Sequence, residues 1–202
     1  MIKTYFGSPG CGKTTLAVKM AIKNKKRYEY TFLNFDHKVK GGFIANLDGL
    51  GEWTFPDSSL ICIDEAGIEY NSRAYKALPK PAIAWFKKHR HYRCDVNVFS
   101  QSWEDMDITI RRLSDQLWYL KRIGPWTLGR RIYKRVTVDK QTEQIIDGYK
   151  MASPLWLLVW PLQLRGRIID KKFTLTFRPF YYKYFDSFSK DNIPVNYHKR
   201  VG

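Results

Sequence analysis

The sequence predicts an α/β fold built on a mainly parallel sheet flanked by helices. Over residues 1–150, short apolar runs of strand length alternate with stretches of helical periodicity, which is typical of such sheets. The first apolar run, Ile2–Phe6, is followed by a glycine-rich loop and then by a helical stretch from Thr15 to Lys26. A later run, Leu60–Ile63, ends at two acidic residues. These observations place polar residues at the carboxyl ends of buried strands, where open α/β sheets bind ligands.

The same patterns predict the rest of the sheet and its helices. Further strands are expected at Tyr30–Asn34, Asp95–Phe99 and Gln116–Lys121, and a late β pair at Ile132–Val138 and Glu143–Tyr149. Helices are expected from Pro79 to about His89 and from Glu104 to Leu113. Glycines and a proline between Lys38 and Asp57 predict a loop there.

Composition indicates one domain of ordinary size and an anionic partner. The chain has 202 residues, and 44% of them are hydrophobic, which is enough to bury a core and excludes wholesale disorder. The net charge of +16 indicates a polyanion or an anionic membrane surface, and nucleic acid is the commonest such partner. Solvated charge that only aids solubility remains the alternative.

The cysteines and the start of the chain indicate a cytosolic protein. Cys11, Cys62 and Cys94 form an odd set whose spacing matches no zinc pattern, so we expect reduced, buried thiols. The chain opens directly into a strand and a loop, so no signal peptide is expected. We therefore expect the host cell cytoplasm, with peripheral attachment to the inner membrane as an option and no secretion.

A C-terminal appendage, residues 151–202, is expected to follow a domain of residues 1–150. Residues 151–164 are strongly apolar but are interrupted by Pro161 and are shorter than the ~20 residues that a membrane-spanning helix needs. They cap a core or lie as an anchor in a membrane interface. The following aromatic and basic stretch alternates at Phe173, Leu175 and Phe177, which predicts a strand.

Residues 7–14 read Gly-Ser-Pro-Gly-Cys-Gly-Lys-Thr and match the Walker A pattern of a phosphate-binding loop. In the predicted strand–loop–helix context, the loop amides and the helix N-terminus point donors at the β- and γ-phosphates of a nucleotide. Lys13 adds a positive charge to the phosphates, and the Thr14 hydroxyl is placed to bind Mg²⁺. The predicted nucleotide-binding residues are Gly7, Ser8, Pro9, Gly10, Cys11, Gly12, Lys13, Thr14 and Thr15.

The strand Leu60–Ile63 and the two acids after it have the Walker B form. Asp64 is predicted to hold Mg²⁺, and Glu65 to orient and deprotonate an attacking water. These two roles turn a binding loop into a hydrolysis site for ATP. A strand end with two solvated acids is the alternative.

Other polar residues are weaker candidates. Gln101 follows the strand Asp95–Phe99, where an amide can sense the γ-phosphate or position water, unless it is an ordinary turn residue. Arg111 and, less favourably, Arg112 are candidates for a guanidinium that reaches the γ-phosphate of a neighbouring subunit. Residues 87–93 read Lys-Lys-His-Arg-His-Tyr-Arg, which is either a basic binding surface or a solvated helix end.

Taken in order, these motifs resemble the zonular occludens toxin (Zot)-like family, the assembly ATPases of filamentous phages. The resemblance covers about residues 1–150. Its specific part is the order of an acidic pair, Arg-His, Ser/Thr-Gln and Ile-Asp-x-x-Ile/Val-Arg. Its residues are Gly7–Thr14, Ile63-Asp-Glu-Ala66, Asn71-Ser-Arg73, His89-Arg-His91, Asp95-Val-Asn-Val-Phe-Ser-Gln101 and Met106-Asp-Ile-Thr-Ile-Arg-Arg-Leu113.

The resemblance implies a P-loop ATPase of the additional-strand, catalytic-glutamate type, related to the FtsK–HerA DNA pumps. It also implies an oligomeric ring at the host inner membrane that works with other phage assembly proteins and extrudes DNA. The roles of Lys13, Thr14, Asp64, Glu65 and Gln101 carry over, and Arg90 or Arg111 is the trans-acting arginine.

The chain departs from the family after residue 150, where family members usually have a membrane-spanning helix. This departure leaves room for a soluble genome-packaging ATPase of a small virus. A nucleotide-dependent assembly adaptor that does not pump DNA is a further alternative, which DNA-stimulated turnover would distinguish. A small-molecule kinase is disfavoured, because it needs no water-activating glutamate.

Overall fold

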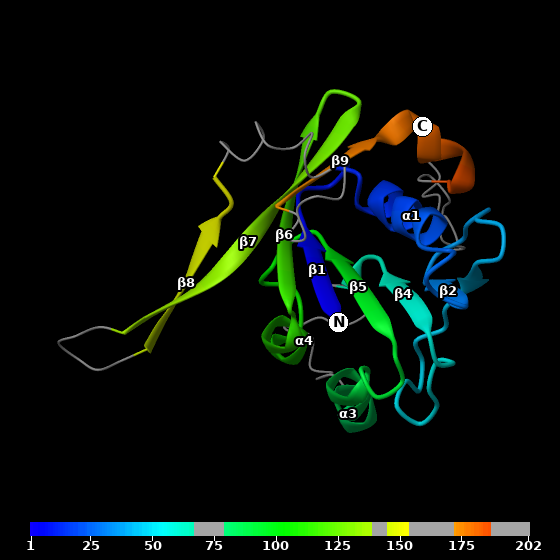
Figure 1. Cartoon of the computed structure of the whole chain (residues 1–202), viewed down its shortest axis with the longest axis horizontal. Coiled ribbons are helices and arrows are strands. Elements are labelled where there is room, and N and C mark those ends of the chain that lie inside the picture. The colour runs from blue at the N-terminus through cyan, green and yellow to red at the C-terminus, as the bar shows by residue number, and fades with distance from the viewer. Residues whose placement is uncertain (67–78, 139–144, 154–171, 187–202) are drawn as a thin grey trace, which may run out of the picture.

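The computed structural model describes residues 1–66, 79–138, 145–153 and 172–186. They form a nine-stranded mixed sheet, with helices on both of its faces (Figure 1). The strand order is β3-β2-β4-β5-β1-β6-β7-β8, and β9 also pairs with β7.

The parallel half of the sheet carries the strands expected from the sequence and one further short strand, β3. It contains β1 (Ile2–Phe6), β2 (Tyr30–Leu33), β3 (Phe43–Ile44), β4 (Ser59–Ile63), β5 (Asp95–Ser100) and β6 (Gln116–Ile123). β5 lies between β1 and β4 and is parallel to both. The strand that precedes the glycine-rich loop is therefore separated by one strand from the strand that precedes the acids. This is the additional-strand arrangement that the resemblance implied.

Two hydrophobic cores follow from the period-two alternation of side chains along the strands. On one face, Leu60 and Cys62 of β4 pack with α1 (Lys13–Lys23). On the other face, Ile61 and Ile63 pack with Trp85 of α3 (Lys80–Lys88), and α4 (Ile108–Leu113) adds Ile110 to the same core. β4 is buried on both sides, as expected of a central parallel strand.

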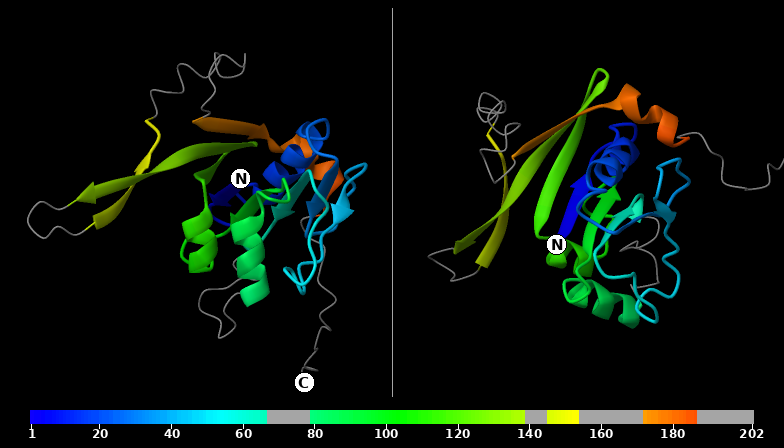
Figure 2. Two further views of the ribbon diagram at one scale, coloured as in Figure 1. Left: turned by 60° about the horizontal axis from the view of Figure 1, so that its bottom comes forward. Right: turned by 45° about the vertical axis from the view of Figure 1, so that its right-hand side comes forward.

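The C-terminal part of the sheet is antiparallel. β7 (Trp126–Val138) pairs with β6, and it also pairs with β8 (Ile145–Met151) and β9 (Phe173–Phe177). A 3₁₀ helix, η2 (Arg178–Tyr184), follows β9 and lies beside α1 (Figure 1). β8 and the far end of β7 extend from the body of the molecule as an arm in all views (Figures 1 and 2).

Several boundaries differ from the sequence-based expectation, each for a local reason. α1 begins at Lys13, before the expected Thr15, because the chain enters the helix directly after Gly12, and it ends at Lys23 because Asn24 leaves helical geometry. α4 is shorter than expected, because the Asp107 side chain accepts a hydrogen bond from the Thr109 N–H (2.7 Å) and caps the helix there.

β7 is longer than the expected Ile132–Val138. It begins at Trp126 because a two-residue turn, residues 124–125, connects it to β6 in direct register. β3 was not expected and is a two-residue strand at the sheet edge. The strand expected from the alternation at Phe173, Leu175 and Phe177 is confirmed as β9.

The three cysteines are buried and unpaired, as expected. The interpretation of residues 151–164 falls almost entirely outside the described residues, and the expected division at residue 150 stays a prediction. β9 and η2, which follow it, belong to the same sheet and core as the first half of the chain. Within the described ranges, no helix has the length and apolar character to span a membrane.

Candidate functional site

The glycine-rich loop connects β1 to α1 at the carboxyl edge of the parallel strands. The Lys13 amine donates to the carbonyls of Gly7 (2.9 Å) and Ser8 (3.3 Å), so the loop curls around this side chain. Gly12 has a φ of 97°, and a Cβ there would lie 2.1 Å from Thr127 Oγ1. Only glycine fits this position, for reasons of both backbone angle and space.

The start of α1 is arranged to receive an anion. Its N-cap residue, Gly12, supplies no side-chain acceptor, and its first turn contains no acidic residue. The first N–H groups of a helix have no partner within the helix, and they attract negative charge. The loop and α1 therefore present donors, together with the Lys13 amine, to a ligand such as a phosphate.

Asp64, at the end of β4, faces this loop. Its Oδ2 accepts a hydrogen bond from the Thr14 hydroxyl (2.5 Å), and its Oδ1 accepts from the Glu65 N–H (3.0 Å). Burial raises the pKa of the Asp64 carboxyl, although these hydrogen bonds and the charge of Lys13 act in the opposite direction. A buried carboxylate next to a hydroxyl is the kind of oxygen pair that Mg²⁺ prefers. The two residues thus fit the predicted metal site.

Asn34 positions Asp64 and was missed by the sequence reasoning. Its side-chain amide donates to the Asp64 carbonyl (2.9 Å), and its Oδ1 accepts from the Asp64 N–H (2.6 Å). Asn34 follows β2, which pairs with β4. A polar residue at the end of a predicted strand was the available signal.

Glu65 and Gln101 are exposed and lie in the same pocket as Asp64. Glu65 has a positive φ of 52°, an unusual angle for a residue other than glycine, which orients its side chain away from the buried path of β4. Gln101 follows β5, the strand between β1 and β4, so it lies between the loop and the acids.

The pocket has a volume of about 680 Å³. We call it the phosphate-loop pocket. It brings together Lys13, Thr14, Asp64, Glu65 and Gln101, which come from separate parts of the sequence. Its lining residues are Pro9, Gly10, Gly12, Lys13, Thr14, Thr15, Asp64, Glu65, Gln101, Arg122, Arg178, Tyr182, Phe185 and Asp186.

The opposite wall of the pocket comes from segments that sequence reasoning did not connect with the loop. Arg122 lies near the end of β6. The other lining residues of this wall, Arg178, Tyr182, Phe185 and Asp186, belong to the segment that follows β9. The Arg178 guanidinium donates to the carbonyls of Gly10 (3.1 Å) and Gly124 (2.6 Å) and is only 6% exposed. Thr127 donates to the Cys11 carbonyl (2.6 Å), so β7 also holds the loop.

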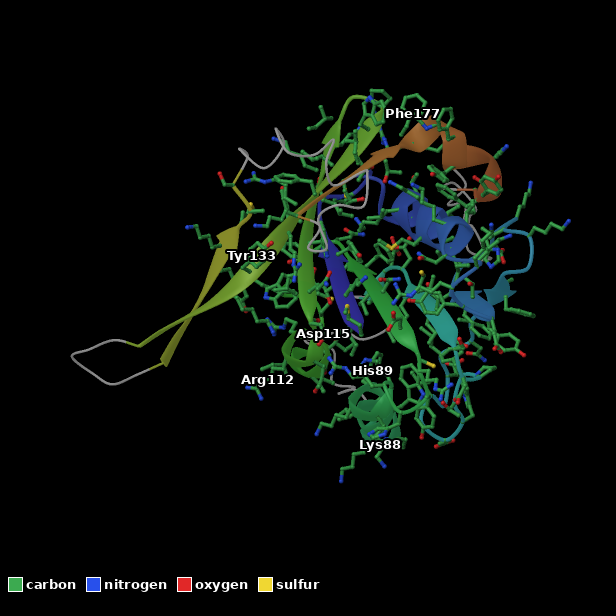
Figure 3. The ribbon with its side chains drawn as sticks, viewed as in Figure 1. Lys88, His89, Arg112, Asp115, Tyr133 and Phe177 are labelled. Atoms are coloured by element: carbon green, nitrogen blue, oxygen red, sulfur yellow. The ribbon has the colours of Figure 1, made fainter. Side chains whose placement is uncertain are left out.

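The arginines proposed from the sequence do not line this pocket. Arg90 pairs with Asp115 near the start of β1. Arg111 lies over the Trp103 ring, 5.9 Å from its centroid. Arg112 is exposed on α4 (Figure 3). Neither Arg90 nor Arg111 is placed to act on a ligand in its own subunit, so a role in a neighbouring subunit remains a prediction.

The strand order, the loop and the flanking helices together define a P-loop NTPase fold. The family model described as Zonular occludens toxin (Zot) matches residues 33–160, which is more than half of the chain. The chain belongs to the Zot family.

Comparison with solved structures agrees with this fold. The chain is similar to the N-terminal domain of zonular occludens toxin from Neisseria meningitidis, with a TM-score of 0.54, 18% identity, and coverage of 77% of this chain and 96% of that one. It is also similar to the genome packaging NTPase B204 of Sulfolobus turreted icosahedral virus 2 in complex with AMPPCP, with a TM-score of 0.50, 11% identity, and coverage of 76% and 97%. No curated protein matches the chain.

Proposed function

We propose that the protein is an ATPase of phage or prophage origin that couples ATP hydrolysis to DNA translocation during virion assembly. The observation that carries this proposal is the meeting of Lys13, Thr14, Asp64, Glu65 and Gln101 in one pocket of a Zot family member. Phosphate-binding groups alone would also suit a switch or a kinase. An exposed carboxylate and an amide beside them support hydrolysis.

The phosphates of ATP bind to the loop amides and to the N-terminus of α1. The Lys13 amine, which contacts loop carbonyls in the present structure, moves its hydrogen bonds to the β- and γ-phosphates. Thr14 and Asp64 would hold Mg²⁺, which neutralises charge on the phosphates when it is bound.

Glu65 accepts a proton from the attacking water, and Gln101 contacts the γ-phosphate or this water. In a ring-shaped oligomer, Arg90 or Arg111 of a neighbouring subunit stabilises charge in the transition state.

Mixing Lys13→Ala and Arg111→Ala subunits tests the trans role. At one kind of mixed interface, the intact loop of an Arg111→Ala subunit meets Arg111 of a Lys13→Ala subunit, so the site is complete. A mixture with no more activity than its components would exclude Arg111.

DNA binding is assigned to the end of the sheet opposite the pocket. Lys87 and Lys88 of α3, Arg93 before β5 and Arg112 of α4 are exposed there and form no ion pair with other described residues. We call these four residues the basic end. Figure 3 shows Lys88 and Arg112 at this end. Such cations bind a phosphate backbone without regard to sequence. We place the oligomer in the host cytoplasm, at the inner membrane and in contact with other phage assembly proteins.

The deciding experiment measures ATP turnover by the assembled protein at low salt, with and without single- or double-stranded DNA. We expect Mg²⁺-dependent hydrolysis that DNA accelerates, and loss of hydrolysis in Lys13→Ala. Turnover that is indifferent to DNA would favour an assembly adaptor. Translocation of duplex DNA without membrane association would favour genome packaging into a capsid.

A further inference from the structure

The phosphate-loop pocket has an aromatic wall that the hydrolysis site does not use. Among its lining residues, the aromatic ones are Tyr182 and Phe185, both from the segment after β9. Phosphates need charged and N–H donors, whereas a nucleobase needs a flat apolar surface. This wall lies outside residues 33–160, the part of the chain that the family model matches.

Hydrogen bonds hold this wall firmly against the loop. Arg178, at the start of η2, donates to the Gly10 and Gly124 carbonyls, as described above. The Tyr184 carbonyl accepts from the Lys38 N–H (2.7 Å), and Lys19 of α1 donates to Thr176 Oγ1 (2.8 Å). η2 is therefore fixed at both ends, and a ligand that binds to it has little ordering cost.

Tyr182 differs from its aromatic neighbours in what its ring contacts. Phe185, Tyr181 and Tyr184 pack into the core that includes α1. Tyr182 is 48% exposed, and its ring lies 6.4 Å from the Phe185 ring between centroids, with the planes at 76°. It thus has ring surface open to the pocket. Phe180 is 69% exposed, but it packs on Phe177 and does not line the pocket.

The expected orientation of a bound triphosphate places its nucleoside near the same aromatic wall. Its γ-phosphate belongs near Asp64, Glu65 and Gln101, because hydrolysis occurs there. The remainder of the nucleotide must then extend along the loop, away from these residues. The C-terminal segment lies against this part of the loop, because Arg178 donates to the Gly10 carbonyl and lies next to Gly12.

We propose that the base of the nucleotide stacks on Tyr182, so that the segment after β9 supplies nucleoside recognition to the phosphate-loop pocket. This inference rests on the proposed ATPase function. It makes Tyr182 a residue for substrate affinity, since the base lies far from the reacting phosphate. The Asp186 carboxylate lines the same wall and is an acceptor for a ribose hydroxyl or an exocyclic amine.

The test measures binding of ATP, ADP and inorganic tripolyphosphate to the full chain and to four variants. Tyr182→Ala removes the ring, Tyr182→Phe keeps it, Phe180→Ala removes a more exposed ring from the same helix, and Lys13→Ala disables the phosphate site. Base–aromatic stacking predicts that Tyr182→Ala weakens ATP and ADP binding by about 5- to 150-fold. Tripolyphosphate binding should be unchanged, and Tyr182→Phe and Phe180→Ala should bind ATP as the wild type does.

A kinetic measurement adds a readout that loss of structure would not give. Tyr182→Ala should raise KM for ATP and leave kcat unchanged. Unchanged ATP affinity in Tyr182→Ala, or an equal loss of tripolyphosphate binding, would overturn the inference. Either outcome would leave the proposed ATPase function intact, provided that the wild type binds ATP and Lys13→Ala does not. Absence of ATP binding by the wild type would overturn both.

Discussion

The two ends of the parallel strands hold their polar groups in different ways. At the carboxyl end, Lys13, Asp64 and Arg178 are buried, and each makes hydrogen bonds to specific atoms of the loop or the strands. At the amino end, Asp95 and Asp115 pair with the N-terminus and with Arg90. The four residues of the basic end remain exposed.

This difference matches two kinds of interaction. Bond making requires groups held within a fraction of an ångström, which burial and hydrogen bonds achieve. Attraction of a polyanion requires only charge near its surface and tolerates mobile side chains. Substitutions should therefore have large, residue-specific effects at the pocket and small, additive effects at the basic end.

The largest effect is expected for Glu65→Gln. The amide keeps the shape of the side chain but cannot accept a proton, so kcat should fall by about 10²- to 10⁴-fold while ATP binding persists. Single-turnover hydrolysis and equilibrium ATP binding measure the two properties separately. Glu52→Gln, an exposed substitution outside the pocket, is the matched control. Wild-type turnover in Glu65→Gln would assign the base to another residue.

Arg178→Ala should have the next largest effect, here on stability. It removes the hydrogen bonds that the buried guanidinium donates to the Gly10 and Gly124 carbonyls, at a cost of about 1.5–3 kcal/mol in the free energy of unfolding. Chemical denaturation measures this change. Arg122→Ala removes an exposed guanidinium from the same pocket and should cost less than about 0.5 kcal/mol. Equal stability of the two variants would contradict the assigned role of Arg178.

At the basic end, we expect a moderate effect that depends on salt. Lys88→Ala/Arg112→Ala should lower duplex DNA affinity and reduce the slope of log K against log salt by about 0.9 for each DNA phosphate that the variant no longer neutralises. ATP hydrolysis without DNA should be unchanged. Lys121→Ala/Lys183→Ala removes two exposed lysines at the carboxyl end of the strands and serves as the control. An equal reduction of affinity in both variants would mean that only net charge matters.

The smallest effect concerns His89, a buried residue beneath the basic end. Its Nδ1 lies 2.7 Å from the Phe86 carbonyl, its Nε2 has no partner among the described residues, and burial lowers its pKa below 6.5. The unfolded chain then binds more protons than the folded one below about pH 6.5, so stability falls on acidification through that range.

Denaturation at about pH 7 and about pH 5.5 tests this expectation. His89→Asn, which does not titrate there, should lose less stability between the two values than the wild type. The pKa of Asp95 is lowered from 3.8, because hydrogen bonds from the N-terminus and Tyr28 outweigh the effect of burial. Its contribution is lost only at lower pH. An identical pH dependence in wild type and His89→Asn would exclude His89 as the cause.

The sequence predicted the parallel half of the fold well, because buried strands and a phosphate-binding loop have strong local patterns. Lys13, Asp64 and Glu65 follow from such patterns directly. Tyr182 and Arg178 do not, since nothing near them in the sequence shows that β9 returns to pair with β7. Long-range antiparallel pairing depends on tertiary contacts, and the alternation that predicted β9 did not identify its partner.

β7 has a mechanical consequence for the whole chain. Its first residues are tied to the phosphate loop through Thr127, and its last residues form the arm that leaves the body (Figure 2). At about 3.3 Å per residue, its 13 residues span about 40 Å. Its first seven residues are held in the sheet by β6, and the six residues from Tyr133 to Val138 continue beyond β6 for about 20 Å. One continuous strand therefore gives the phosphate loop a direct backbone connection to the arm.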